Sequence, residues 1–445
     1  MDDKSVTTFD FTQVLPAEIT EKILHLLNAY ELSTFQLVCV KWREIANTDY
    51  LWIHFCISRG WLKYGVSFDI LKEESWNPNP FSNSSSSSPL FVLNVPGNTR
   101  LSPICKWKHV FIRMEHLNLN WRKGRYTVVA ALKSHTDKVT AFDCQDNCLV
   151  SGSNDRTVCI WDLRTCKCIR KVEGYSNTIT AVKILGSLAV FGLGDGCIHV
   201  INTTTGDHEL TFLGHSDCIS HISVDHYFVI SASSDCTVKV WSLISKELMH
   251  TMTLHTDEIE CMFSYGNHVA TGSWDRTLIL WCVETGVCVH QYVGHNEVVS
   301  CCQFDSTKIV SGSYDGDVRI WSCQSGHCIH LLSGHRGEVY CVVYNDYCIA
   351  SGSSDSTIIL WSHLGILLHT LSEHMGIVRC LHINEERLVS GGDQRMIIVW
   401  DFKSGKKLAV LHRNPTKLHL MWVGETKLIT ASPEKSGTMT LLSFW

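Results

Sequence analysis

Histidine, aspartate and tryptophan residues recur along this sequence at a spacing of about 40 residues. An imidazole beside a carboxylate can exchange protons with a substrate, so each His–Asp pair is a candidate for general acid–base catalysis. A buried tryptophan adds an indole N–H that needs a hydrogen-bond acceptor. The recurring residues are His135, Asp155, Trp161, His215, Asp235, Trp241, His255, Asp275, Trp281, His295, Asp315, Trp321, His335, Asp355, Trp361, His374, Asp393 and Trp400.

The repetition of these residues favours a structural role over catalysis, because the same set returns in repeat after repeat. A clear example is Gly334–Trp361, which holds a Gly-His pair, a Ser-Gly-Ser run, an Asp and a Trp at fixed offsets. Repeats of about 40 residues with this content are typical of the four-stranded blades of a β-propeller. Short strands must therefore position these side chains, and we predict an all-β propeller.

Seven repeats can be counted, and two of them depart from the pattern. The second repeat has Tyr175 in place of the histidine and Ile201 in place of the tryptophan. The seventh has one residue fewer between His374 and Asp393 than the others have between their His and Asp. We still expect His374 and Asp393 to act as the structural pair of the seventh blade.

The two ends of the repeat region indicate an eighth blade. Lys417–Trp445 lacks the His-Asp-Trp set but contains three strand-like runs, and Tyr126–Leu132 is a single strand-like run before the first repeat. A strand from the N-terminal side that completes the last blade would close the ring and protect the sheet edges. We therefore favour eight blades. The alternative is a seven-bladed ring with Lys417–Trp445 packed outside it.

A helical pattern precedes the repeats. The segment starting at Leu15 has apolar residues at helical spacing, and it carries more apolar surface than three short helices can bury internally. Such a surplus usually marks a partner site. The segment resembles the F-box through Leu15-Pro16, Glu18-Ile19, Val38-Cys39, Lys41-Trp42 and Leu51-Trp52.

The F-box resemblance implies binding to the Skp-type adaptor of cullin ubiquitin ligases. It assigns the adaptor contacts to Leu15, Pro16, Ile19 and Ile23. The alternative is that these are ordinary core residues of a small helical domain. The expected organisation is a short tail (1–11), an F-box (12–58), a linker with a Ser/Pro-rich loop (59–102), a helical connector (103–121) and the propeller (122–445).

An F-box followed by such repeats resembles the F-box/WD-repeat family, in particular its eight-bladed members. The resemblance implies a hydrogen-bonded network of His, Ser, Asp and Trp within each blade. It also implies a non-catalytic substrate receptor of an SCF-type ubiquitin ligase, acting with adaptor, cullin and RING subunits. The competing hypothesis is an interaction scaffold that binds the adaptor without directing degradation.

In this family the substrate binds the propeller face that carries the loops between blades. The corresponding positions form a basic arc of Arg379, Lys417, His419 and Lys138, and an acidic, aromatic arc of Trp274, Tyr314, Tyr340, Glu258 and Glu260. We predict a bipartite site, in which the aromatic arc binds apolar or basic substrate residues and the basic arc binds an acidic or phosphorylated residue. The alternative is that these are scattered surface residues.

Bulk properties narrow the remaining functions. The net charge of -6 argues against a nucleic-acid partner. No apolar run approaches the roughly 18 residues of a membrane span, and the N-terminus lacks a signal-peptide layout. We therefore expect a cytoplasmic or nuclear protein whose 21 cysteines are reduced. Cysteine spacing predicts no metal site, no cofactor motif is found, and a single copy per complex is expected.

Overall fold

The computed structural model describes residues 11–66, 104–393, 396–412, 418, 420–431 and 437–445. It divides into two compact units, Met1–Asn120 and Trp121–Trp445. Most of the predicted linker lies outside the described residues, including the serine run Ser84–Ser88. Lys417 and His419, which were assigned to the basic arc, also lie outside them.

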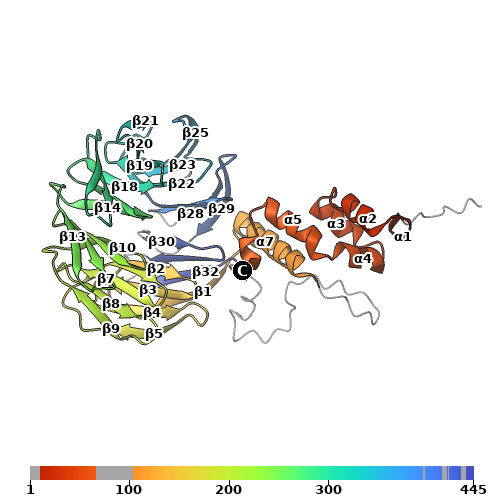
Figure 1. The fold of residues 1–445 in the computed structure, drawn as a ribbon, viewed down its shortest axis with the longest axis horizontal. Helices are drawn as coiled ribbons and strands as arrows, with labels where there is room; N and C mark the ends of the chain where they lie inside the picture. Colours follow the sequence, from red (N-terminus) through yellow and green to blue (C-terminus); the bar gives the residue numbers. More distant parts are fainter. Residues whose placement is uncertain (1–10, 67–103, 394–395, 413–417, 419, 432–436) are drawn as a thin grey trace, which may run out of the picture. The chain divides into compact units, whose positions relative to one another are not determined.

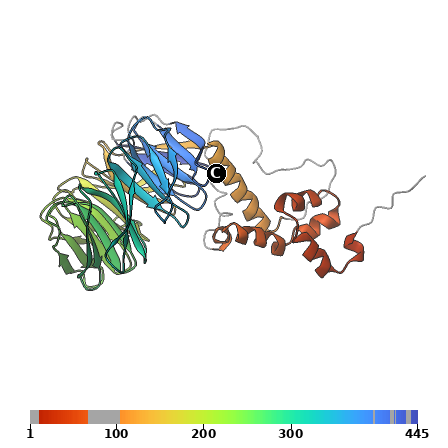
Figure 2. The same ribbon diagram turned by 90° about the horizontal axis from the view of Figure 1, so that it is seen from above.

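The first unit is helical (Figures 1 and 2). Its helices are α1 (Phe11–Val14), α2 (Ala17–Leu24), α3 (Ala29–Phe35), α4 (Val40–Ala46), α5 (Asp49–Ser58), α6 (Lys63–Val66) and the start of α7 (Lys106–Lys123). Asn28 begins α3 with a capping box, in which its side chain accepts from the Glu31 N–H and the Glu31 carboxylate accepts from the Asn28 N–H.

Aromatic side chains form the core of this unit. Trp52 is 2% exposed and donates its indole N–H to the Ala46 carbonyl at 2.8 Å. Phe111 of α7 packs against Trp52 with ring centroids 5.4 Å apart, while Phe35 stacks on Trp42 at 4.1 Å. The predicted helical connector therefore contributes directly to the core of the helical unit.

The second unit is a β-propeller of eight four-stranded sheets. Blades 1 to 4 are formed by β2 (Val139–Gln145), β3 (Cys148–Ser153), β4 (Val158–Asp162), β5 (Lys167–Val172); β6 (Ile179–Leu185), β7 (Leu188–Leu193), β8 (Ile198–Asn202), β9 (His208–Phe212); β10 (Ile219–Val224), β11 (Phe228–Ser233), β12 (Val238–Ser242), β13 (Leu248–Met252); and β14 (Ile259–Tyr265), β15 (His268–Ser273), β16 (Thr277–Cys282), β17 (Cys288–Val293). Within each of these blades, strands consecutive in sequence pair antiparallel.

Blades 5 to 7 repeat the same order. They are formed by β18 (Val299–Phe304), β19 (Lys308–Ser313), β20 (Asp317–Ser322), β21 (Cys328–Ser333); β22 (Val339–Tyr344), β23 (Ile349–Ser353), β24 (Ile358–Trp361), β25 (Leu367–Leu371); and β26 (Val378–Ile383), β27 (Leu388–Gly392), β28 (Met396–Asp401), β29 (Lys406–His412). The second strand of each blade is buried almost throughout. It carries small residues where the next blade packs: a Cβ on Gly352 would lie 2.7 Å from a methyl carbon of Val378.

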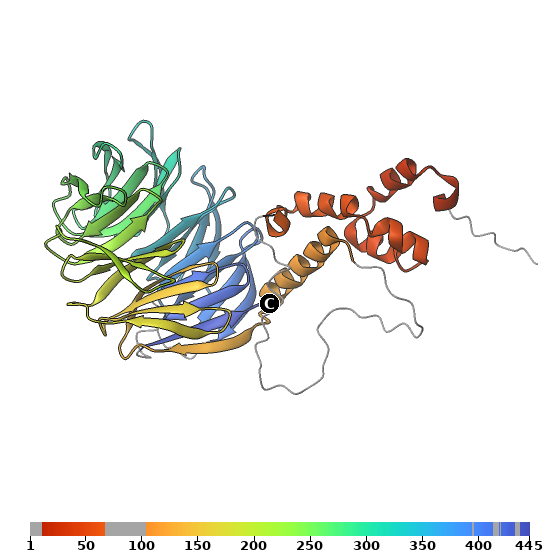
Figure 3. The ribbon, with the colours of Figure 1, turned by 60° about the horizontal axis from the view of Figure 1, so that its bottom comes forward.

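The eighth blade closes the ring. It contains β30 (Leu420–Val423), β31 (Lys427–Ala431) and β32 (Thr438–Ser443), with β1 (Thr127–Lys133) added as its outer strand. Strand β1 pairs antiparallel with β32, from Thr127 opposite Ser443 to Lys133 opposite Thr438. Figure 3 shows the orange β1 strand beside the blue strands of the last blade. The prediction of eight blades is thus confirmed, and the alternative of a seven-bladed ring is excluded.

The start of the propeller is anchored to its last blade. The Trp121 ring stacks on Phe444 with centroids 3.5 Å apart, and its indole N–H donates to the Glu425 carbonyl at 2.7 Å. The Arg387 guanidinium lies 4.6 Å from the Trp121 ring centroid. Among the described residues, no helix is both long enough and apolar enough to span a membrane.

Candidate functional site

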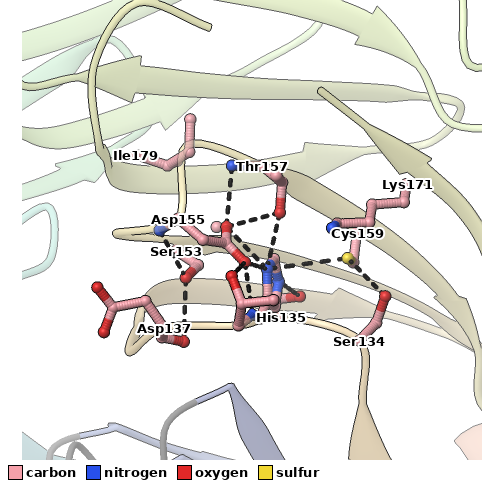
Figure 4. Close-up of polar contacts among 12 residues, drawn as sticks. Ser134, His135, Asp137, Ser153, Asp155, Thr157, Cys159, Lys171 and Ile179 are labelled. Carbon is pink, nitrogen blue, oxygen red and sulfur yellow. Dashed lines mark hydrogen bonds and ion pairs between the residues drawn. The ribbon is translucent and has the colours of Figure 1, made fainter. Parts of the chain in front are cut away.

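The recurring histidines lie in a buried network that repeats from blade to blade. In blade 1, His135 Nε2 lies 2.8 Å from Ser151 Oγ, and Trp161 donates its indole N–H to the same Oγ at 2.9 Å. His135 Nδ1 lies 3.1 Å from Asp155 (Figure 4). Because Ser151 accepts from the indole, its own proton can go to His135 Nε2, which leaves Nδ1–H to donate to Asp155.

The same contacts recur in four more blades. The His Nδ1–Asp distances are 2.8, 2.7, 3.1 and 3.1 Å for His215–Asp235, His255–Asp275, His295–Asp315 and His335–Asp355. The indole N–H donates to a hydroxyl at 2.8–3.0 Å in the pairs Trp241–Ser231, Trp281–Thr271, Trp321–Ser311 and Trp361–Ser351.

In blade 6, electrostatics keep the network in one protonation state. Burial lowers the pKa of His335, against the opposing effect of Asp355. Burial would raise the pKa of Asp355, but hydrogen bonds from the Thr357 hydroxyl and from backbone N–H groups outweigh it and lower that pKa. The pair is therefore a neutral imidazole beside a carboxylate, tied at every polar atom, which is an arrangement suited to holding a loop against a sheet.

Blade 2 replaces this network with apolar contacts. Tyr175 occupies the histidine position, and its ring lies 5.0 Å from the ring of Phe191, which occupies the serine position. Burial raises the pKa of Tyr175 to about 12. Ile201, in the tryptophan position, is fully buried.

In blade 7, Asp393 does not pair with His374 as the sequence predicted. His374 Nε2 contacts Ser390 Oγ at 2.7 Å, and Trp400 donates to the same oxygen at 2.8 Å, as in the other blades. Asp393, however, pairs with Arg379 at 3.2 Å. Among the described residues, His374 Nδ1 is buried without a hydrogen-bond partner.

The backbone explains why Asp393 is displaced. In blade 6 the N–H of Ser354, the residue before Asp355, donates to the Glu338 carbonyl; in blade 7 the N–H of Asp393 makes this bond, to Ile377. Asp393 thus corresponds to Ser354 and not to Asp355. No residue is missing from blade 7, because the distance from serine to tryptophan is ten residues in both blades. The His374–Asp393 interval is shorter because Asp393 stands one position before the place of Asp355.

This backbone bond defines equivalent positions on the propeller face that carries the loops between blades. Three positions are defined in each of blades 1 to 7. The loop slot is the residue whose carbonyl accepts this bond, and the turn slot is the residue whose N–H donates it. The strand slot is the residue two positions after the loop slot. The loop slots are Lys138, Thr178, Cys218, Glu258, Val298, Glu338 and Ile377. The turn slots are Asn154, Gly194, Ser234, Trp274, Tyr314, Ser354 and Asp393. The strand slots are Thr140, Thr180, Ser220, Glu260, Ser300, Tyr340 and Arg379.

Blades 4 to 6 bring three aromatic side chains into one row. The Trp274 ring meets Tyr314 edge-on at 6.4 Å, and Tyr314 lies 5.4 Å from Tyr340. We call Trp274, Tyr314 and Tyr340 the aromatic row. Trp274 is 46% exposed, and the two tyrosines are partly buried. Three residues that the sequence assigned to one arc are therefore neighbours in the structure.

Carboxylates hold the polar edges of the aromatic row. The Trp274 indole N–H donates to Glu260 at 2.9 Å, and the Tyr340 hydroxyl donates to Glu338 at 2.6 Å. Burial, followed by the negative charge of Glu260, raises the pKa of Tyr314 to about 12. The hydrogen bond to Glu338 raises the pKa of Tyr340. Glu258 is exposed in the loop slot of blade 4.

Arg379 continues the row instead of opening a basic arc. Its guanidinium carbon lies 5.5 Å from the Tyr340 ring centroid, and its Nε pairs with Asp393. Lys138, in the loop slot of blade 1, is exposed. Sequence reasoning placed Arg379 on the correct face but missed Asp393 as its partner; the constant serine-to-tryptophan interval was the signal that could have revealed it.

The predicted adaptor contacts lie at the start of the helical unit. Pro16 and Ile19 are exposed, and Leu15 and Ile23 are partly buried. Further large apolar side chains are more than 60% exposed on the same unit: Val14, Leu26, Tyr30, Leu37, Val38, Val40 and Tyr50. These residues leave a substantial apolar surface uncovered.

Fold and network together define a WD-repeat propeller joined to a helical unit of F-box type. The F-box-like family model matches residues 12–58, and the family model "WD domain, G-beta repeat" matches residues 126–162, 206–242, 246–282, 286–322, 326–362 and 365–401. The chain belongs to the F-box/WD-repeat proteins.

Curated relatives agree with this classification, and a solved structure shares the fold over most of the chain. An F-box protein of Saccharomyces cerevisiae is 31% identical over 37% of this chain and 24% of its own length. A probable E3 ubiquitin ligase complex SCF subunit sconB of Talaromyces stipitatus is 25% identical over 58% of this chain and 51% of its own length. The computationally designed Ika8 protein has a TM-score of 0.67 and 26% identity, over 71% of this chain and 99% of that chain. The matches thus span between a quarter and half of these two natural relatives.

Proposed function

We propose that this protein is the substrate-recognition subunit of an SCF-type ubiquitin ligase. The observation that carries the proposal is the presence of both parts in one chain: an F-box-like unit and a WD-repeat propeller. Relatives named as SCF subunits support it. In this role the protein binds a Skp-type adaptor and, through it, the cullin and RING subunits, in the cytoplasm or the nucleus.

The chain would contribute to ubiquitin transfer by positioning and not by chemistry. A substrate held on the propeller has its lysines close to a charged ubiquitin-conjugating enzyme, which raises their effective concentration. The His–Asp pairs take no part in this step, because their polar atoms are already used within the buried network.

We assign adaptor binding to Leu15, Pro16, Ile19 and Ile23. Apolar side chains exposed around these positions, such as Leu26 at 85%, would gain about 25 cal/mol for each Å² they bury against a partner. The neighbouring exposed apolar residues extend this surface, and large exposed apolar patches usually mark interaction sites.

Co-purification tests the adaptor assignment. The full chain and a Leu15→Ala/Pro16→Ala variant are each expressed with the adaptor and the cullin. We expect the wild-type chain to retain both partners and the variant to lose them. Ile57→Ala is the matched control, because Ile57 is 56% exposed and apolar but outside the assigned contacts. Equal retention by wild type and double variant would refute the assignment.

The competing function, an adaptor-bound scaffold, predicts the same co-purification result. Reconstituted ubiquitin transfer to a bound partner separates the two functions. A ligase receptor accelerates transfer to its bound partner relative to an unbound protein, whereas a scaffold leaves both rates equal.

A further inference from the structure

The loop-bearing face of the propeller changes character between blades 3 and 4. In blades 2 and 3 the turn and strand slots hold only Gly, Ser and Thr. The Thr180 hydroxyl, for example, already donates within the ring, to the Ile219 carbonyl of the next blade at 2.5 Å. In blades 4 to 7 the loop, turn and strand slots hold the aromatic row, four carboxylates and a single cation. The carboxylates are Glu258, Glu260, Glu338 and Asp393.

Contacts within the chain occupy the polar edges of Trp274 and Tyr340, so a ligand would bind the exposed parts of the rings. The indole N–H of Trp274 and the hydroxyl of Tyr340 are occupied by Glu260 and Glu338. These carboxylates bring negative charge next to rings whose faces are themselves electron-rich. Both features attract a cation and oppose an anion.

Arg379 gives an internal example of a cation held at the end of the aromatic row. The Arg379 side chain lies over the Tyr340 ring and pairs with Asp393, and both charged side chains are largely shielded from solvent, at 24% and 18% exposure. An arginine of this chain therefore occupies the end of the row with the two contacts that guanidinium groups favour, a ring face and a carboxylate. Asp393 also neutralises Arg379, which is the one cation in the loop, turn and strand slots of blades 4 to 7.

We propose that blades 4 to 7 bind an unphosphorylated substrate segment rich in arginine or lysine, which inserts cationic side chains over Trp274, Tyr314 and Tyr340 beside Glu258, Glu260 and Glu338. This inference rests on the proposed function, and it replaces the bipartite, partly phosphate-binding site expected from the sequence. A phosphorylated segment meets the carboxylates of Glu258, Glu260 and Glu338 at this surface, so like-charge repulsion disfavours it.

Peptide binding to the full chain, in complex with its adaptor, tests the substrate class. The probes are three fluorescein-labelled twelve-residue peptides with identical Gly-Ser backbones that carry three arginines, three glutamates or three phosphoserines. We expect the arginine peptide to bind at least tenfold more tightly than the others, with an affinity that falls as salt rises. Tighter binding of the phosphoserine peptide would overturn the proposal.

Substitutions locate the site. Tyr340→Ala and Glu260→Gln/Glu338→Gln are each expected to weaken arginine-peptide binding about tenfold, since hot-spot aromatics and charge pairs carry a large share of binding energy. Ser234→Ala, in the turn slot of blade 3, is the matched control and should leave binding unchanged. Unchanged affinity in both site variants would refute the location.

Arg379→Gln is expected to change peptide affinity in opposite directions for the two substrate classes. If the surface binds cations, removing the internal guanidinium frees Asp393 and the Tyr340 face, and arginine-peptide binding strengthens by about threefold or more. If the surface binds phosphate, the same change weakens phosphoserine-peptide binding. Weaker binding of the arginine peptide by this variant would overturn the proposal.

The readouts separate this inference from the ligase function. All variants are expected to keep the adaptor, because the changes lie in the propeller. Adaptor binding without any preference for the arginine peptide refutes the cationic substrate class and leaves the proposed function intact. Loss of the adaptor from the wild-type chain would instead refute the proposed function.

Discussion

Blades 6 and 7 share one buried network and differ in a single carboxylate. In both, a serine joins a histidine Nε2 to a tryptophan N–H. In blade 6 Asp355 completes the network, whereas in blade 7 the nearest aspartate, Asp393, pairs with Arg379 on the propeller face. The comparison shows that the His–Ser–Trp part suffices to form a blade, and that the carboxylate can be redirected to the surface.

The serine should carry the largest share of stability in both blades. Ser351→Ala removes the partner of both His335 Nε2 and Trp361 Nε1, and two buried groups without partners should lower the free energy of unfolding by about 3 kcal/mol. Urea unfolding of the full chain measures the loss. Ser354→Ala, a neighbouring serine in the turn slot, is the control. A loss below about 1 kcal/mol would show that the network is dispensable.

Replacing Asp355 of blade 6 should cost more stability than replacing Asp393 of blade 7. Asp355 accepts from Arg336 N–H, from the N–H and hydroxyl of Thr357, and from His335, so Asp355→Ala should cost about 2 kcal/mol. Asp393→Ala breaks one partly exposed ion pair and should cost less than about 1 kcal/mol. Equal losses on unfolding would mean that Asp393 has a structural role comparable to that of Asp355.

Mild acid should destabilise blade 7 through its histidine. Burial lowers the pKa of His374 from 6.5 to about 4. Between these values the unfolded chain binds a proton that the folded chain does not, so this contribution is fully present above pH 6.5 and is lost as the pH falls. At pH 5.5 the loss reaches about 1.4 kcal/mol.

The corresponding measurement compares urea unfolding at pH 7.5 and 5.5. His374→Gln should reduce the acid-induced loss by about 1.4 kcal/mol, because the titrating group is gone. Any stability that His374→Gln already loses at pH 7.5 cancels, because the measurement compares the same variant at two pH values. An unchanged pH dependence would show that His374 is protonated equally in both states.

The spacing of repeated residues was sufficient to predict the fold. A 40-residue period and one strand-like run ahead of the first repeat predicted eight blades and their closure, because blade packing imposes the same residues at the same positions each time. The site was predicted less completely. Glu258, Glu260 and the aromatic row could be placed on one face by counting within the repeat.

The roles of Arg379 and Asp393 could not be predicted in this way. The sequence shows an arginine in a strand slot, but it does not show that the aspartate which seemed to complete the seventh blade lies one position earlier in the backbone pattern. Which of two partners a carboxylate chooses depends on distances between neighbouring strands. Here those distances pair Arg379 with Asp393, so the guanidinium that the sequence assigned to the basic arc is neutralised within the chain.

The pairing of β1 with β32 also determines when the propeller can close during synthesis. Strand β1 leaves the ribosome first, but its partner follows roughly 300 residues later, which corresponds to about 15–60 s of synthesis at 5–20 residues per second. Until then β1 keeps an unpaired edge. The ring can therefore close only after its last strand has been made, and we expect the nascent propeller to depend on chaperones that shield open strand edges until that moment.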